Sequence, residues 1–238
     1  MPALTDIKLQ KVNYYEQVAD ILEGSILDGS LAGNGKLPSE ADLASKFNVS
    51  RTIIRESLKL LKERGLVQMK TGNGSYITRP EASTISGILN RFIKLDNISD
   101  DDIYVIRYSL ELTAARIAAG KASDVELDKM EELTDEMERQ KNDIDRRVLL
   151  DCDFHIAVAR ASGNVLLAVF IESVSEILRK VIRRGVLVPG RNQDGIVRHR
   201  KILAALRKRD PDLAESAMRE HLEVSWDNVL RNKAWQDD

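Results

Sequence analysis

The chain has 238 residues, of which 43% are hydrophobic and 31% are charged, and its formal net charge at pH 7 is −2. This composition excludes an intrinsically disordered protein, and no apolar run approaches the roughly 18 residues of a membrane span. The first residues lack the pattern of a secretory signal, and the single cysteine, Cys152, cannot form an intrachain disulfide. We therefore expect a cytoplasmic protein without a membrane partner.

The length favours two domains, and the charge is distributed unevenly between the two halves of the chain. Residues 1–80 hold 11 Lys and Arg against 9 Asp and Glu, whereas the remainder holds 25 against 29. Neither balance establishes a nucleic-acid partner, so the positions of the charges must decide.

Three helices are predicted in the first 65 residues. Apolar residues recur at helical spacing over residues 12–27, and the glycines of "DGSLAGNG" end that helix. In "LPSEADLASKF", Ser39 can cap a short helix with Asp42 as its capping-box partner. After the turn "NVS", Ser50 can cap a third helix, "RTIIRESLKLLKERG", which ends at Gly65.

The segment "LVQMKTGNGSYIT" follows, with two short runs of β-forming residues around a glycine-containing turn. This pattern is typical of a β-hairpin. Helix, short helix, turn, helix and hairpin together predict a winged helix-turn-helix DNA-binding domain over residues 1–80.

The third helix has an apolar and a basic stripe. The apolar stripe holds Ile54, Leu58 and Leu61, and the basic stripe holds Arg51, Arg55, Lys59 and Lys62. A recognition helix needs this division, because one face packs while the other reaches base edges and phosphates in the major groove. A basic face can also be merely solvated, but the capped helix, the short turn and the hairpin favour DNA. The candidate DNA-contacting residues are Arg51, Thr52, Arg55, Lys59 and the wing glycines Gly72 and Gly74.

Beyond the hairpin, helical spacing continues to the end of the chain. The expected helices cover residues 85–95, 100–119, 123–141, 145–162, 164–185, 194–208 and 211–232. We therefore predict a mainly α fold, in which the winged helix-turn-helix is followed by a C-terminal antiparallel all-α bundle over residues 81–238.

The chain's three histidines have a notable spacing. Asp151 and His155 are four residues apart and share a helix face, whereas Cys152 and Asp153 point elsewhere. His199 and His221 each lie 11 residues from Asp210, which begins the last helix with "DPD". On two antiparallel helices, both stand about 16 Å from the turn and at the same level.

These four side chains predict a site for a divalent metal such as Zn, Ni or Mn. The alternative is that each histidine is an ordinary core or surface residue. An octahedral ion with four protein ligands keeps two positions, enough for a bidentate carboxylate, so a small organic acid is the natural guest.

Two resemblances support this interpretation. "LPSEADLASKFNVSRTIIRESLKLLKERGLVQMKTGNGSYI" resembles the DNA-binding domain of GntR-type bacterial transcription regulators, in which arginines at the positions of Arg51 and Arg55 contact the operator. Many relatives carry an arginine where this chain has Ala41. "IRYSLELTAARIAA", "DCDFHIAVARASGN" and "RHRKILAALRKRDPDLAESAMREHL" resemble the FCD effector domain of the FadR subfamily.

The FCD resemblance implies metal ligation by Asp151, His155, His199 and His221, and an effector contact by Arg107. The alternative for Arg107 is an ion pair with Glu111, one turn away. Asn164 is a second candidate effector contact, with capping of the following helix as its alternative.

We therefore expect a homodimeric transcription regulator whose affinity for double-stranded operator DNA is controlled by a small carboxylate effector, and not an enzyme. Two alternatives are a regulator that senses the metal itself and a metal-dependent hydrolase with an appended DNA-binding domain. The sequence leaves the effector, the metal, the operator and the direction of regulation undetermined.

Overall fold

The computed structural model describes residues 13–31, 35–70, 72–79, 82–140, 142–186 and 192–236. The chain divides into two compact units, Met1–Glu81 and Ala82–Asp238. None of the helices in the described ranges is long and apolar enough to cross a membrane.

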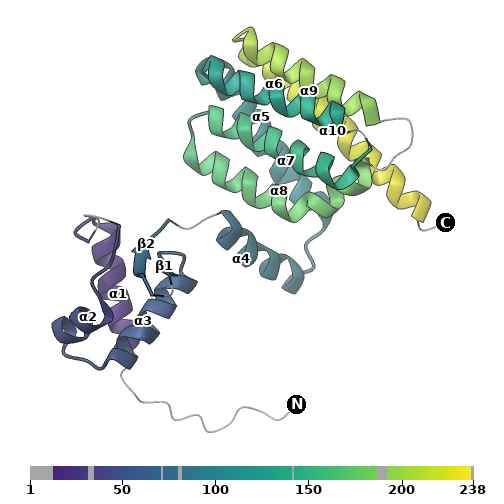
Figure 1. The fold of residues 1–238 in the computed structure, drawn as a ribbon. Coiled ribbons are helices and arrows are strands. Elements are labelled where there is room, and N and C mark those ends of the chain that lie inside the picture. The colour runs from purple at the N-terminus through teal and green to yellow at the C-terminus, as the bar shows by residue number, and fades with distance from the viewer. Residues whose placement is uncertain are drawn as a thin grey trace. The chain divides into compact units, whose positions relative to one another are not determined.

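The first unit is a winged helix-turn-helix (Figure 1). Its elements are α1 (Tyr14–Leu27), α2 (Glu40–Phe47), α3 (Arg51–Glu63), β1 (Val67–Lys70) and β2 (Gly74–Ile77). The two strands pair antiparallel with Val67 opposite Ile77 and Lys70 opposite Gly74, as expected for a hairpin. The mainly α architecture with a hairpin wing is confirmed.

Local sequence determines where the helices of this unit begin. Ser39 accepts a hydrogen bond from the backbone of Asp42, whose carboxylate accepts one in return from the Ser39 backbone, so the expected capping box is present. Ser50 accepts from the backbone N–H of Ile53 at the start of α3. These contacts satisfy N–H groups that have no partner within the helix.

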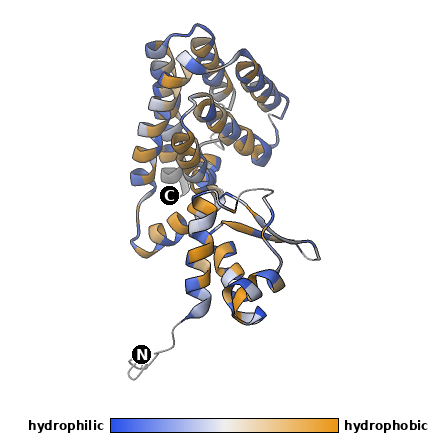
Figure 2. Cartoon of the chain, turned by 90° about the vertical axis from the view of Figure 1, so that its left-hand side faces the viewer, coloured by the Kyte–Doolittle hydropathy of each residue, from blue (hydrophilic) through white to orange (hydrophobic). Residues whose placement is uncertain are grey.

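The core of the first unit forms where α1, α2 and α3 pack together. The side chains of Ile54, Leu58 and Leu61 are at most 1% exposed, as the apolar stripe of α3 predicts. Figure 2 shows this division between hydrophobic and hydrophilic residues along the helices. Burying each such side chain contributes roughly 1.5–3 kcal/mol, so this stripe fixes the orientation of α3.

The second unit consists of helices packed side by side (Figure 1). They are α4 (Ala82–Leu95), α5 (Asp100–Lys121), α6 (Asp124–Arg139), α7 (Ile144–Ala161), α8 (Val165–Val186), α9 (Asn192–Arg207) and α10 (Pro211–Gln236). The expected helices are all present. The largest difference at a helix start is at α4, which begins at Ala82 rather than at residue 85.

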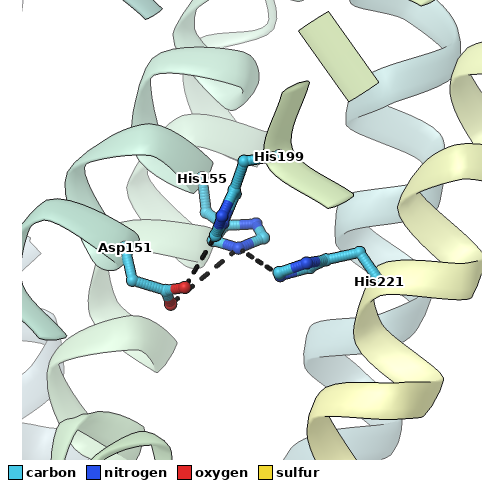
Figure 3. Close-up of side chains that lie close together, drawn as sticks. All are labelled: Asp151, His155, His199 and His221. Carbon is cyan, nitrogen blue, oxygen red and sulfur yellow. Dashed lines mark hydrogen bonds and ion pairs between the residues drawn. The ribbon is translucent and has the colours of Figure 1, made fainter. Parts of the chain in front are cut away.

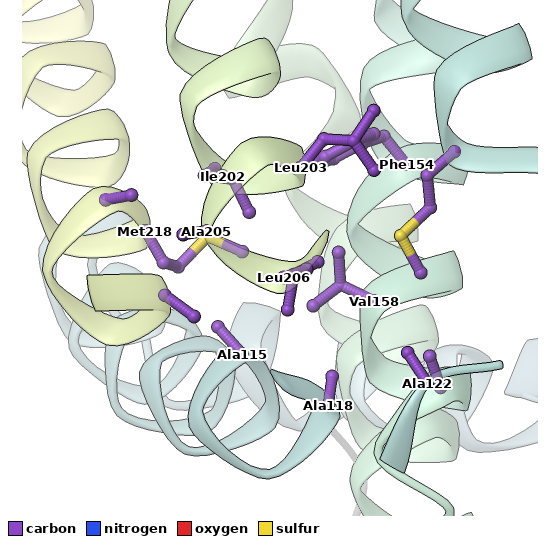
Figure 4. Close-up of a cluster of buried hydrophobic side chains, with 14 of the residues drawn as sticks. Ala115, Ala118, Ala122, Phe154, Val158, Ile202, Leu203, Ala205, Leu206 and Met218 are labelled. Carbon is purple, nitrogen blue, oxygen red and sulfur yellow. The ribbon is translucent and has the colours of Figure 1, made fainter. Parts of the chain in front are cut away.

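Buried alanines on α5 allow its neighbours to approach closely. Ala115 and Ala118 are fully buried against residues of α7, α9 and α10, among them Phe154, Leu206 and Met218 (Figure 4). Small residues facing large ones fill the interior at the density typical of protein cores. The inner faces of α5, α7, α9 and α10 are thereby held in fixed rotation, which determines which polar side chains meet inside the bundle.

Candidate metal centre and nucleic-acid interface

Three helices bring four potential metal ligands together inside the bundle (Figure 3). Asp151 and His155 lie on α7, His199 on α9 and His221 on α10, and their ligand atoms all lie within 4.8 Å of one another. The Nε2 atoms of His155 and His221 are 3.1 Å apart, and Nε2 of His199 lies 3.3 Å from Oδ1 of Asp151. The side chains expected to converge therefore do so.

The turn between α9 and α10 sets the level of two of these histidines. Oδ1 of Asp210 accepts hydrogen bonds from the backbone N–H groups of Asp212 and Leu213, and Pro211 is the first helical residue. This cap fixes the start of α10. The rings of His199 and His221, each 11 residues away, have centroids 4.3 Å apart.

A buried chain of charges holds His155. Its Nδ1 donates to Oε2 of Glu111, and Oε1 of Glu111 accepts from Nε of Arg107 at 2.6 Å. Because Nδ1 carries the proton, the Nε2 lone pair points toward the other ligands. Burial alone would raise the pKa of Glu111, but Arg107 and His155 lower it to about 2, so Glu111 is ionised at neutral pH.

The protonation states of the other ligands also suit a cation. Burial lowers the pKa of His199 and lowers that of His221 well below its ordinary value, so both rings are neutral at pH 7. Burial alone would raise the pKa of Asp151, but its contact with His199 and the nearby imidazoles holds it well below the usual range. The result is one carboxylate and three neutral imidazoles, the protonation state that metal binding requires.

The separations of the donor atoms fit a divalent ion. Donors about 2.1 Å from an ion lie about 3–3.5 Å apart when adjacent and about 4.2 Å apart when opposite. The separations of 3.1 and 3.3 Å lie in the first range, and that of 3.9 Å between Nε2 of His155 and Oδ2 of Asp151 lies between the two. One carboxylate and three imidazoles are a donor set that Zn²⁺, Ni²⁺ and Mn²⁺ all accept.

A cavity of about 70 Å³ opens beside these ligands. Asp151, His199 and His221 form part of its wall, together with Arg107. The two interpretations of Arg107 are therefore compatible, because it lines the cavity while its Nε pairs with Glu111.

The structure does not bring Asn164 to this cavity. Asn164 is exposed at the start of α8, where its Oδ1 accepts from the backbone N–H groups of Leu166 and Leu167. This contact is the helix cap that was its alternative. Asp153 is exposed, and Cys152 is buried with Sγ 4.0 Å from the carbonyl oxygen of Ser175, so neither joins the ligand cluster.

Sequence reasoning missed several polar residues around the cluster. Glu111 was identified only as a partner for Arg107, although it also orients His155. Two further buried arginines in the cavity wall, Arg147 and Arg198, were not identified. Their spacing held a clue, because Arg147 precedes Asp151 by one helical turn and Arg198 adjoins His199.

The basic residues expected to contact DNA lie on the exposed side of α3. Arg51, Thr52, Arg55 and Lys59 are all exposed. Nε of Arg55 donates to Oε2 of Glu40 at 2.7 Å, and Nζ of Lys59 lies 2.7 Å from Oε1 of Glu56. Glu40 comes from the "LPSE" motif at the start of α2, so the two helices of the motif are joined through a side chain of the basic face.

The wing glycines occupy backbone conformations that other residues rarely adopt. Gly72 and Gly74 have φ angles of 73° and 99° at the hairpin turn. A side chain at Gly74 would also press on Lys36, whose Cε lies 3.1 Å from the position that its Cβ would take. Nζ of Lys36 and of Lys70 lie 5.5 and 4.9 Å from the ring centre of Tyr76, which adds positive charge beside the turn.

Two family models match the two units. Residues 14–77 match the bacterial regulatory proteins of the gntR family, and residues 102–224 match the FCD domain. The second match alone spans more than half of the chain, and together the two matches account for most of the described residues.

Curated proteins and solved structures agree. The chain is 31% identical to the HTH-type transcriptional repressor NanR of Cronobacter sakazakii over 92% of this chain and 87% of that protein. It is 34% identical to the HTH-type transcriptional regulator LutR of Bacillus subtilis over 66% of this chain and 72% of that one. The solved structure of a Streptococcus agalactiae GntR protein superposes with a TM-score of 0.64 at 29% identity, covering 88% of this chain and 97% of that chain. The chain therefore belongs to the GntR family of bacterial regulatory proteins and is a DNA-binding transcription regulator with an FCD domain.

Proposed function

We propose that this regulator binds a divalent metal through Asp151, His155, His199 and His221, and that a small organic acid bound beside the metal controls its affinity for operator DNA. The observation that carries this proposal is the convergence of these four buried or half-buried ligands on one wall of a cavity inside the FCD domain. Arg107, in the same wall, offers a guanidinium to the acid. The ion, when bound, supplies a positive centre to which a carboxylate attaches.

For DNA, we propose that α3 enters the major groove. Arg51 and Arg55 would reach base edges or phosphates, with Thr52 and Lys59 holding phosphates farther along the helix. Gly72 and Gly74 would let the wing backbone approach the sugar-phosphate chain. Because two half-sites are read by a two-fold pair, the acting species would be a homodimer, and its action on chromosomal DNA places it in the cytoplasm.

Operator binding tests the DNA part of this proposal. The full-length protein should bind a fluorescent duplex from the region upstream of its own gene, measured by anisotropy at several salt concentrations. The Arg51→Met and Arg55→Met variants should lose tenfold or more in affinity and show a smaller salt dependence, because each removes a cation near a phosphate or base. Unchanged binding in both variants would overturn the assignment of α3.

The effector part is tested by adding metal and organic acids to the same assay. Asp151→Ala should bind less metal and lose the response to any acid while it still binds the duplex. If the metal alone changes operator affinity and no acid adds to that change, the metal is itself the signal. If metal content is unchanged in Asp151→Ala, the proposed site is wrong.

The relatives support regulation rather than catalysis, since NanR and LutR are transcription regulators. No catalytic residue is assigned on this basis.

A further inference from the structure

The cavity beside the ligand cluster has a second polar end. On α10, Ser225 and Asn228 lie one and two turns beyond His221, and both line the cavity. They are displaced from the histidine by about 6 and 10 Å along the helix axis. On α7, Arg147 lies one turn, about 6 Å, before Asp151 and lines the same cavity. The cavity therefore extends away from the metal ligands.

The charges around this cavity are unbalanced. Arg107, Arg147 and Arg198 contribute three guanidinium groups, whereas Asp151 is the sole carboxylate among the described residues that line it. Glu111, behind the wall, neutralises Arg107 through a direct ion pair. Asp151 faces His199 and His155. The positive charge of the other two arginines is thus not matched by a carboxylate of the cavity wall, and a bound divalent ion would add to it.

Both of these arginines are buried, with exposures of 6% for Arg147 and 8% for Arg198. Each takes part in an interaction inside the protein, so neither is a bare charge. Burying guanidinium groups is nevertheless costly, and a planar carboxylate is the partner that their forked donors match best. An anionic group of a ligand would therefore be favoured at this end.

Between the two polar ends the wall is apolar. Leu178, Val181 and Ile182 come from α8, and the stacked rings of Tyr104 and Trp226, with centroids 4.4 Å apart, come from α5 and α10. Such a wall suits the carbon chain of a small ligand and offers little to a third charged group.

We propose that the effector is a short dicarboxylate, with one carboxylate at the metal and the other held by Arg147 and Arg198. This inference rests on the proposed function of the site and names the class of acid that it selects. A monocarboxylate would lack the second anionic group that this end of the cavity favours.

Matched pairs of acids test the proposal on the Zn²⁺-loaded full-length protein. The pairs are malate against 2-hydroxybutyrate, 2-hydroxyglutarate against 2-hydroxypentanoate, and galactarate against galactonate. Each pair differs in the group at the far end, a carboxylate in the diacid only. Titration calorimetry should show at least one diacid binding about tenfold or more tightly than its partner, the factor expected for a charge-assisted hydrogen bond. Metal content is measured after each titration, so that removal of the metal by chelation is recognised.

Variants assign the preference to the two arginines. Arg147→Met and Arg198→Met should reduce the diacid preference to about onefold, whereas the exposed neighbour Arg146→Met should leave it unchanged. Circular dichroism and metal content verify that each variant is folded. Arg147→Lys and Arg198→Lys, which keep the charge without the planar fork, should retain part of the preference.

The outcomes separate this inference from the function on which it rests. If monoacids bind as tightly as their diacid partners, or the preference survives both Met variants, the inference is overturned and the organic-acid site stands. If the metal binds but none of the acids does, the proposed effector function fails and this inference fails with it.

Discussion

His155 is fixed from two directions. Its Nδ1 is bound by Glu111, which in turn is bound by Arg107, while its Nε2 faces His221 and Asp151. A histidine held in this way keeps one tautomer and one ring orientation, so its lone pair needs no reorganisation before a metal binds. Glu111 is therefore a positioning residue whose effect reaches the metal through His155.

Replacing Glu111 by Gln should weaken metal binding by roughly 10–100-fold, because the neutral amide supports the His155 ring less strongly. Competition with a chromophoric chelator measures the change. Glu132→Gln, at an exposed position on α6, is the control for loss of one carboxylate. Equal metal affinity in wild type and Glu111→Gln would show that the buried pair has only a structural role.

Tyr104 gives the protein a distinct alkaline response. Burial, with the neighbouring Tyr108 and Glu223 as further causes, raises the pKa of Tyr104 to about 12 from its ordinary value of 10. Between these values the unfolded chain loses this proton while the folded chain keeps it, so the free energy of unfolding falls as pH rises from about 10 to 12. In Tyr104→Phe this fall should be smaller, as measured by urea unfolding across the same pH range. An identical pH dependence in both proteins would contradict the raised pKa.

At the scale of single elements, helix starts share one device. α2, α5 and α6 each begin with a capping box, in which Ser39, Ser99 or Ser123 exchanges hydrogen bonds with an acidic residue three positions later. Two N–H groups are satisfied at each start, and the acidic side chain also lies at the positive end of the helix dipole.

Ser123→Ala should therefore destabilise the FCD domain by about 1 kcal/mol, the usual effect of removing a capping side chain. Chemical denaturation followed by circular dichroism measures the loss. Ser109→Ala, an exposed substitution inside α5, is the matched control and should be neutral or slightly stabilising, because alanine has the higher helix propensity. Equal effects at both positions would show that the cap contributes nothing specific.

The helices could be predicted from the sequence where local patterns determine them. The stripe of α3 and the caps at Ser39, Ser50 and Asp210 are local, and the structure has each of them. The start of α4 is different, because the carbonyl oxygen of Ala82 accepts hydrogen bonds from Ser86 and from Ser173 on α8. That last contact joins residues 91 positions apart, so periodicity alone could not reveal it.

The ligand cluster was predictable for a similar reason. A tight turn with equal offsets to His199 and His221 places them at one level without knowledge of the rest of the fold. The role of Glu111 and the positions of Arg147 and Arg198 depend on how α5, α7 and α9 are rotated about their axes. That rotation is set by core packing, such as the buried alanines of α5, and a single helical pattern does not determine it.

At the scale of the whole molecule, the two units have separate hydrophobic cores. Leu22, Ile54 and Leu58 belong to the core of the winged unit, and Phe154 and Leu206 belong to that of the helical unit. The candidate metal ligands all lie in the second unit. A ligand that binds one folded unit stabilises that unit by mass action.

Removing the metal should therefore destabilise one unit selectively. In calorimetry, a chelator should lower the unfolding temperature of the helical unit and leave the transition of the winged unit in place. The loss is about 4 kcal/mol where the metal had been present at roughly 1,000 times its Kd. Asp151→Ala should no longer respond to the chelator. Equal shifts of both transitions would show that the metal stabilises the whole chain as one cooperative unit.

The concentration of all three histidines of the chain in one cluster has a practical consequence. In an untagged preparation, every imidazole resonance in a proton NMR spectrum comes from the ligand site. The same holds for every histidine modified by an imidazole-directed reagent. Occupancy of the site can thus be followed in the intact protein, with no isotope labelling of selected residues and no background from histidines elsewhere.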